Sequence, residues 1–416
     1  NPAAFDVDGD SLAYRLSRPQ EGVVNSCRSR FIPAYLDPTS FSTQREDGSG
    51  SPSFTIDAKT GDLCWDSPGR AGQFNFAFII EEWRNGVLIG EITRDMVSIV
   101  VDQPSKRPLI VGAEVCVEAG TLINQAIQAT DPDGQRVIIS GFGGPFNLNS
   151  DGLPFPAGQE LVKPAYARLI NGNVIQNQPA TATFSWQTNC DHVREEPYDI
   201  TLKVNDIPGR GAVSLASFAT LRVRIYAPSV KNVTARPTAT ASGRAIQLNW
   251  NPYTCGRIVS SSGIADTTEL IIYRKEGCTN YTPDACETGL RASLGYQRIG
   301  SVPYTATSYI DTSALRRGVS YSYRIVARNP GLLSNGGVSV ASNEACLELP
   351  LLAPVITQVT VDSTDTQRGQ ITVKWTRPLG LQPGDLGAPY QYRLQRATGL
   401  TGTECTTIAT INTTIQ

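Results

Sequence analysis

The chain has 416 residues, and 36 lysines and arginines nearly balance 38 aspartates and glutamates, which gives a formal net charge of −2 at pH 7. This balance, with only 18% charged residues, excludes a basic nucleic-acid binder and a polyanionic tail. The length is far more than one hydrophobic core needs, so it predicts several domains. The sequence has no run of about 18 apolar residues, so we expect no membrane-spanning helix.

Short runs of alternating hydrophobicity recur between clusters of Gly, Pro, Asn and Asp, whereas helical periodicity is nearly absent. In chain order these runs lie at 74–83, 87–101, 136–142, 182–188, 198–204, 221–227, 245–250, 269–275, 321–327, 370–375 and 390–396. Such spacing is typical of β-sandwiches, so we predict an all-β fold. Asn85-Gly86, between the first two runs, is a signal for a type I′ hairpin turn.

Linkers divide the chain into four units. The linkers lie at 102–111, 226–235 and 347–356, and the units that they separate are 1–103, 104–228, 229–349 and 350–416. The first three units have the size of immunoglobulin-like sandwiches, and the fourth is shorter. The chain starts without a leader pattern and stops within a strand-like run. We therefore expect a segment of a longer polypeptide, truncated in its first and fourth units.

The third and fourth units share one pattern. An apolar-x-Trp strand, AIQLNW in the third and QITVKW in the fourth, precedes a strand that contains tyrosine. The third unit continues with GVSYSYRIVARN at 318–329. These features resemble the fibronectin type III domain. The resemblance implies that Trp250 and Trp375 fill sandwich cores and that a tyrosine hydroxyl ties a corner to the backbone.

The first and second units share a looser pattern, in which an Asp-x-Asp-Gly turn opens a strand. FDVDGDSLAYRL begins the first unit, and ATDPDGQRVIISG lies in the second. The first unit adds FTIDAKTG and a PGRAGQF corner, both of which the second lacks. These units resemble cadherin-like or bacterial immunoglobulin-like modules. The resemblance implies two further β-sandwiches.

Longer phrases, among them EEWRNGVLIGEITRDM, FSWQTNC and IYRKEGC, are similar to large gliding-motility-associated surface proteins of Bacteroidota. Proteins of that kind leave the cell through the type IX secretion system. The resemblance implies an extracellular, outer-membrane-associated protein with several domains. It also implies a C-terminal sorting domain, which these 416 residues do not contain.

The nine cysteines fit no metal-binding spacing, so we interpret them as structural disulfides of an exported protein. Sequence does not fix their connectivity. Confining each bond to one unit gives Cys116–Cys190, Cys255–Cys346, Cys278–Cys286 and Cys27–Cys64, and leaves Cys405 unpaired.

The turn at Asp6, Asp8 and Asp10 places alternate carboxylates on one side of the chain, an arrangement that suits calcium. In cadherin-like modules the same stretch can bind calcium near a domain junction. The alternative is a turn in which Asp and Gly simply suit the backbone.

The second unit repeats the turn at Asp131 and Asp133, where Gln135 replaces the third carboxylate. Asp206 is a more distant candidate ligand for this site, and Asp102 could serve between units. The same two interpretations, calcium site or plain turn, apply here.

Other candidate chemistry is sparse. His192, the single histidine, is best interpreted as a support for its own turn, because no triad partners accompany it. Glu81 and Glu82 are adjacent on a strand and point to opposite faces, so they cannot flank one glycosidic bond, and the same holds for Glu195 and Glu196. Trp83, Tyr296 and Tyr304 are candidates for a sugar-stacking platform. Thr267 and Ser363 follow aspartates in tripeptides that look like Bacteroidota O-glycosylation acceptors.

The sequence thus predicts a non-catalytic, extracellular structural or adhesive segment, a rod of four sandwiches in line about 100 Å long. The alternative is a binding or spacer appendage of a secreted polysaccharide-degrading enzyme. Expected partners are other surface proteins or copies of the chain, the secretion machinery during export, and surface polysaccharide. No cofactor is required, and calcium is the one ion that the sequence suggests.

Overall fold

The structure is a computed structural model. It describes residues 4–6, 10–45, 47–148, 153–154, 156, 162, 165–209, 212–240, 243–256, 258–261, 264–313, 315–330, 336–349, 354–378, 390–399, 402 and 404–413. Within these residues the regular structure is almost entirely β-strand, with four short 3-10 helices. The prediction of an all-β chain of tandem sandwiches is confirmed. No helix in the described part is long and apolar enough to cross a membrane.

The first unit contains one three-stranded sheet and two small hairpins. Its elements are β1 (Ser11–Ser17), β2 (Gln20–Gly22), β3 (Ser29–Phe31), η1 (Pro38–Phe41), β4 (Phe54–Ile56), β5 (Leu63–Trp65), β6 (Gly72–Arg84) and β7 (Val87–Val100). The sheet has the order β1-β6-β7, and β4-β5 covers it over a core of Phe54, Phe76 and Phe78. Asn85 and Gly86 join β6 to β7 with positive φ at both residues, as the type I′ turn requires.

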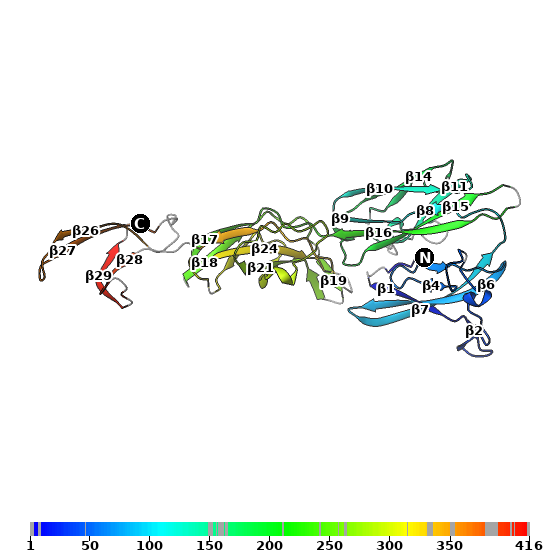
Figure 1. Ribbon diagram of the computed structural model, residues 1–416, viewed down its shortest axis with the longest axis horizontal. Helices are drawn as coiled ribbons and strands as arrows, with labels where there is room; N and C mark the ends of the chain where they lie inside the picture. The colour runs from blue at the N-terminus through cyan, green and yellow to red at the C-terminus, as the bar shows by residue number, and fades with distance from the viewer. Residues whose placement is uncertain are drawn as a thin grey trace.

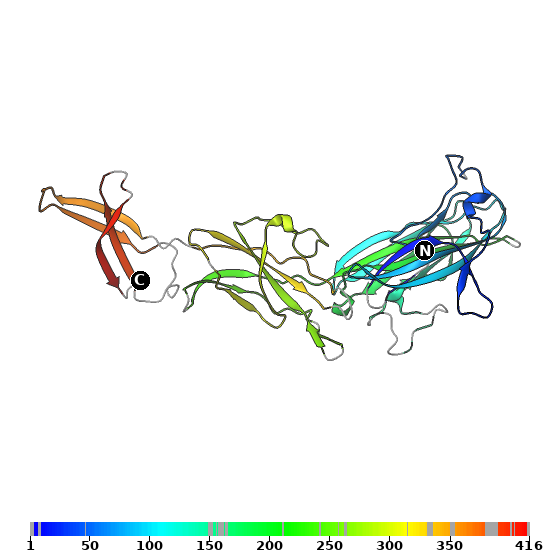
Figure 2. The same ribbon diagram turned by 90° about the horizontal axis from the view of Figure 1, so that it is seen from below.

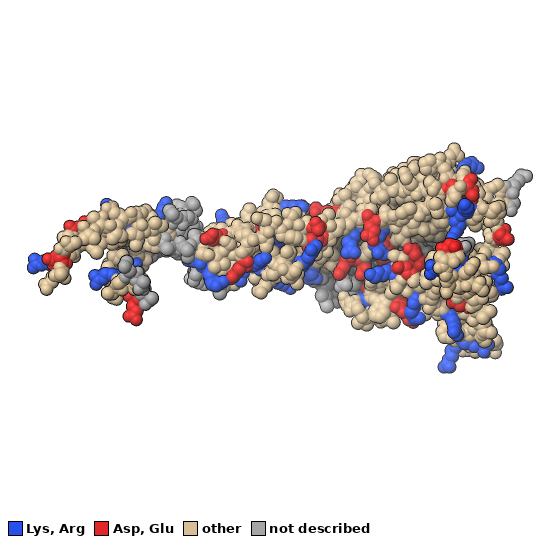
Figure 3. Space-filling view, viewed as in Figure 1, with Lys and Arg blue, Asp and Glu red and all other residues tan. Residues whose placement is uncertain are grey.

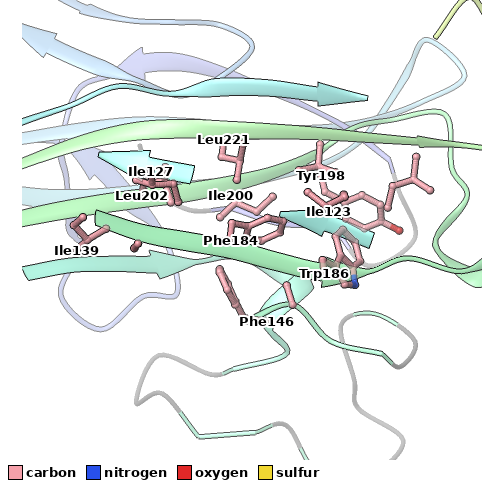
Figure 4. Packing of buried hydrophobic residues seen from close by; sticks show 14 of the residues in the cluster. Ile123, Ile127, Ile139, Phe146, Phe184, Trp186, Tyr198, Ile200, Leu202 and Leu221 are labelled. Atoms are coloured by element: carbon pink, nitrogen blue, oxygen red, sulfur yellow. The ribbon is translucent and has the colours of Figure 1, made fainter. Parts of the chain in front are cut away.

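The second unit is a complete two-sheet sandwich. Its elements are β8 (Leu109–Ile110), β9 (Ala113–Glu118), β10 (Leu122–Thr130), β11 (Arg136–Phe142), η2 (Gly144–Phe146), β12 (Arg168–Ile170), β13 (Ile175–Gln176), β14 (Ala180–Gln187), η3 (Cys190–His192), β15 (Tyr198–Ile207) and β16 (Ala216–Tyr226). The sheets have the orders β12-β14-β10-β8 and β13-β11-β15-β16-β9. Strict alternation along β14 sends Phe184 and Trp186 inward to the core in Figure 4.

The third unit packs a three-stranded sheet on a four-stranded one. Its elements are β17 (Thr234–Thr240), β18 (Gly243–Asn249), β19 (Ile258–Ser261), β20 (Ile264–Thr267), β21 (Glu269–Glu276), η4 (Ala292–Leu294), β22 (Gln297–Pro303), β23 (Ser308–Asp311), β24 (Ser320–Arg328) and β25 (Ala345–Glu348). The sheets are β17-β18-β23 and β22-β21-β24-β25. Trp250 is buried in the core, as expected, and its Nε1 donates to the Ala306 carbonyl at 2.9 Å.

The fourth unit consists of two hairpins in its described part, β26 (Val355–Ser363) with β27 (Gln370–Thr376) and β28 (Tyr390–Ala397) with β29 (Cys405–Thr413). Trp375 and Tyr392 lie 6.1 Å apart between ring centroids. Trp375 is only half-buried, whereas Trp250 is buried. The expectation that both tryptophans fill a core therefore holds for Trp250 alone.

The units do not lie in a single row. In Figures 1 and 2 the first unit lies beside the second, and only the third and fourth units continue along the long axis. The expectation of four sandwiches in line is therefore wrong. The physical reason is an aromatic contact, because Phe5 of the first unit packs against the core of the second at Tyr198, with ring centroids 6.4 Å apart.

A hydrogen bond between a tyrosine hydroxyl and the backbone fixes one corner of the third unit. The Tyr321 hydroxyl, on a buried side chain in β24, accepts from the Arg316 backbone N–H at 2.7 Å. This is the tie from a tyrosine to the backbone that the sequence led us to expect.

Substituting Tyr321→Phe should lower the free energy of unfolding of the third unit by about 1–2 kcal/mol, because the Arg316 N–H then lacks its acceptor. Tyr273→Phe is the matched control, since no hydrogen bond joins its hydroxyl to the described residues, and it should cost less than about 0.5 kcal/mol. Urea unfolding of both variants gives the comparison. Equal losses would show that the corner bond does not contribute.

Candidate functional site

Two disulfides cross from the second unit to the third. Cys116 in β9 bonds Cys286, with the Cα atoms 6.1 Å apart. Cys190 in η3 bonds Cys255 in the loop after β18, with the Cα atoms 5.5 Å apart. A third bond, Cys278–Cys346, lies within the third unit. The junction between the second and third units is therefore covalent.

All four expected pairs are wrong: Cys116–Cys190, Cys255–Cys346, Cys278–Cys286 and Cys27–Cys64. The expectation confined each bond to one unit, whereas the ends of two sandwiches meet here and bring their cysteines together. Cys27 and Cys64 are exposed free thiols, and so is Cys405, the one cysteine that the pairing left over.

Apolar and polar contacts seal the same junction. Tyr253 of the third unit packs against the cores of both units, and Cys255 is counted within the second core at 1% exposure. Burial raises the pKa of the Tyr253 phenol, with a smaller contribution from Glu118, so this hydroxyl stays neutral. Lys231 and Glu118 form an ion pair at 3.5 Å at the edge.

The junction between the first and second units is noncovalent and charged. The Arg194 guanidinium lies 3.8 Å from the Tyr198 ring centroid and 5.2 Å from that of Phe5, and its Nη1 donates to the Asp6 carbonyl at 3.2 Å. A cavity of about 320 Å³ remains between the units. Figure 3 shows charges of both signs gathered along this seam. Asp199 and Arg222, which line the cavity, form a bidentate pair at 2.8 and 2.9 Å.

The predicted acidic turn of the first unit lies at this seam. Carboxylate oxygens of Asp6, Asp10 and Glu82 lie within 4.8 Å of one another, and Asp8 lies outside the described residues. Arg84 binds the buried Asp10 carboxylate through two nitrogens and neutralises it. Sequence reasoning missed Glu82, because it comes from β6 far along the chain.

The electrostatics of this cluster reflect crowded carboxylates. Burial raises the pKa of the Glu82 carboxyl, and the nearby Asp6 and Asp10 raise it further. On the opposite face of β6, hydrogen bonds from Arg15 and Trp83 lower the pKa of Glu81. The two adjacent glutamates thus point to opposite faces of β6, as expected. Their surroundings shift their pKa values in opposite directions.

The predicted calcium turn of the second unit and its more distant candidate ligand in β15 have three buried oxygens without a hydrogen-bond donor among the described residues. They are Asp131 Oδ2, Gln135 Oε1 and Asp206 Oδ2. Asp206 lies in β15 opposite Val137 of β11, so Gln135, two residues earlier, belongs to the same face. Asp131 Oδ1 accepts from the Gln135 N–H at 3.1 Å. Asp131 and Gln135 thus share the turn that precedes β11, and Asp206 lies in the strand paired with β11.

Asp133 does not join this set. Its exposed carboxylate accepts from the Lys106 N–H at 2.5 Å and from the Ser105 hydroxyl at 3.4 Å, in the linker from the first unit. Gln178 closes the other side, since its amide donates to the Asp131 and Gln135 carbonyls and its Oε1 accepts from the Asp131 N–H at 2.6 Å. An all-oxygen donor set between two carboxylates suits a hard cation such as calcium.

The remaining candidates have structural surroundings. His192 is fully buried, its Nδ1 accepts from the Asn189 N–H at 3.1 Å, and its ring lies 4.8 Å from that of Trp186. Trp83, Tyr296 and Tyr304 are half-buried. Ser363 is exposed at the end of β26, and Thr267 is partly buried at the end of β20. Glycosylation at these two residues stays a prediction.

Comparisons with solved structures give matches at low sequence identity and low TM-score. No protein-family model and no curated protein matches the chain. Domains A168–A170 of titin match with a TM-score of 0.22 and 10% identity, over 82% of this chain and 100% of that chain. The FN1–FN3 domains of chicken CNTN1 give 0.21 and 11%, over 82% and 90%. EC1-2 of human mucin-like protocadherin gives 0.20 and 16%, over 51% and 98%.

Replacing Glu82 by Gln tests the carboxylate cluster. A raised pKa in the folded state stabilises the protein below the ordinary pKa of glutamate, and this stability is lost as pH rises through the folded pKa. In calcium-free buffer at pH 7, Glu82→Gln should therefore raise the Tm, on the order of 1–3 °C, and the gain should vanish near pH 4.

Glu81→Gln is the matched control with the opposite sign. Because the pKa of Glu81 is lowered, its contribution is present at pH 7 and lost as pH falls, so this variant should melt lower at pH 7. If both variants shift the Tm in the same direction at pH 7, the described electrostatics are wrong.

Proposed function

We propose that the chain is a non-catalytic, extracellular spacer of a bacterial surface protein that holds a binding or assembly end away from the cell. The covalent junction between the second and third units supports this proposal most strongly. Flexible linkers suffice to tether domains, whereas two bonds across one junction restrict the angle between them. A fixed angle is what a stiff support needs.

The finer assignment rests on the sequence phrases that resemble gliding-motility-associated proteins of Bacteroidota. On that basis we propose export through type IX secretion, attachment at the outer membrane, and partners among other surface proteins or copies of the same chain. Disulfides within and between units fit such an oxidising, exported setting. The half-buried Trp83, Tyr296 and Tyr304 lend no support to a sugar-stacking platform.

We further propose that calcium binds at Asp131, Gln135 and Asp206. Each of the two carboxylates buries one oxygen that has no donor among the described residues, and a divalent cation bound there would remove that cost. The site adjoins the linker through Asp133, so a bound cation would stiffen the approach from the first unit. For Asp6 and Asp10 calcium stays a prediction, because Arg84 already neutralises Asp10.

Small-angle scattering of the whole chain tests the spacer. The radius of gyration should rise on mild reduction while far-UV circular dichroism stays constant, because the sandwiches persist but their angle is released. An unchanged radius of gyration after complete reduction of the disulfides would contradict the proposal that these bonds set the shape.

Asp206→Asn tests the calcium site. In the wild type, calcium at about 100 times its Kd should raise the Tm of the second unit on the order of 5–10 °C, and Asp206→Asn should lose this shift. Glu195→Gln removes an exposed charge from the same unit and should keep it. A calcium response that is equal in all three proteins would place the ion elsewhere, and no response in the wild type would eliminate the site.

A further inference from the structure

We infer that the disulfides form a short covalent path that carries tension past the cores of the second and third units. Cys116 bonds Cys286, a separation of 170 residues, and Cys278 bonds Cys346, a separation of 68. Between the two bonds lies only the arc from Cys278 to Cys286. The biological role of this path rests on the proposed spacer function, whereas the path itself follows from the connectivity.

The route of the force is set by chain topology. Tension that enters the second unit from its N-terminal side reaches β9 and passes through Cys116 to Cys286. From there the chain offers two routes to Cys346, the direct one of roughly 60 residues and the arc of about 8 residues back to Cys278. The shorter route becomes taut first. Strands β10 to β24 therefore lie in closed loops that bear no load.

The position of the two ends suits this role. Cys116 lies in β9, near the start of the second unit, and Cys346 lies in β25, the last strand of the third. The path thus enters at the beginning of one sandwich and leaves at the end of the next. In Figure 1 these two units lie consecutively along the long axis, on which the fourth unit follows.

Buried hydrogen bonds hold the arc in place. Arg324, 1% exposed, donates to the Tyr281 carbonyl in the middle of the arc and to the Ser342 carbonyl at 2.7 Å. The Thr279 N–H donates to Glu344 Oε1 at 2.8 Å, next to β25. The arc is therefore anchored to β24 and to the residue that precedes β25, the strand through which the load leaves.

The bond Cys190–Cys255 lies inside the bypassed region and adds nothing to the path. This makes it an internal control. Its removal should affect the junction but not the length that the chain gains under force.

Single-molecule stretching of the whole chain between its termini tests the path. At about 3.4 Å per residue, the oxidised protein should extend by roughly 30 Å between Cys116 and Cys346. Adding reductant to the same stretched molecule should release on the order of 750 Å more. Measuring the wild type in this way avoids variants that fail to fold.

Paired serine variants sharpen the test. C278S/C346S should gain roughly 180 Å over the wild type, because the direct route of about 60 residues then carries the load. C116S/C286S should gain roughly 300 Å, since the path then runs through Cys190–Cys255. C190S/C255S should gain none. Full extension of the oxidised wild type would overturn the path, and gains that do not depend on which pair is removed would do the same.

A failure of this experiment differs from a failure of the spacer proposal. The scattering measurement reports the angle between units without load, whereas stretching reports the covalent route. A stiff molecule that extends fully under force would contradict the covalent path alone. A flexible molecule that shows the short extension would contradict the spacer alone.

Discussion

The disulfides Cys116–Cys286 and Cys190–Cys255 are the constraint on which the rest of the molecule depends. Interfaces between neighbouring sandwiches are usually small, and relative motion of the domains is the default expectation. Here two bonds close loops of 170 and 65 residues through the same junction. They remove much of the freedom of the unfolded chain and also fix the orientation of two folded units. Tyr253, which is partly buried, packs against both cores at this junction.

The two described junctions between units differ in their chemistry. The one between the second and third units is covalent, so its integrity follows the redox state of its surroundings. The one between the first and second units depends on Arg194, on aromatic rings and on charged groups, and it lies beside Glu82, whose pKa is raised by burial and by the nearby Asp6 and Asp10. Its stability therefore follows pH and salt. At the extracellular location proposed above, the protein would meet both kinds of change, each acting at a separate junction.

Sequence reasoning reached the features that depend on local pattern. Alternation along β14 and the Asn85-Gly86 turn predicted β-strands and a hairpin, and the apolar-x-Trp motif predicted that Trp250 is buried in a core. It failed where distant segments meet. The partner of Cys116 is 170 residues away in another unit, and Glu82 approaches Asp10 only through strand pairing. Asp206 could be named as a candidate from the sequence because it lies near the end of a strand-like run. The hydrogen bond from the Lys106 N–H to Asp133 depends on how the linker packs, which the sequence pattern does not give.

Hydrogen exchange of the linker between the second and third units tests the fixed junction most directly. Ala227, Val230 and Val233 are almost fully buried there. In the oxidised protein, peptides covering residues 227–233 should exchange as slowly as those of β15, and reduction should expose the linker before it exposes β15. Rapid exchange of the linker in the oxidised protein, with β15 still protected, would contradict the account.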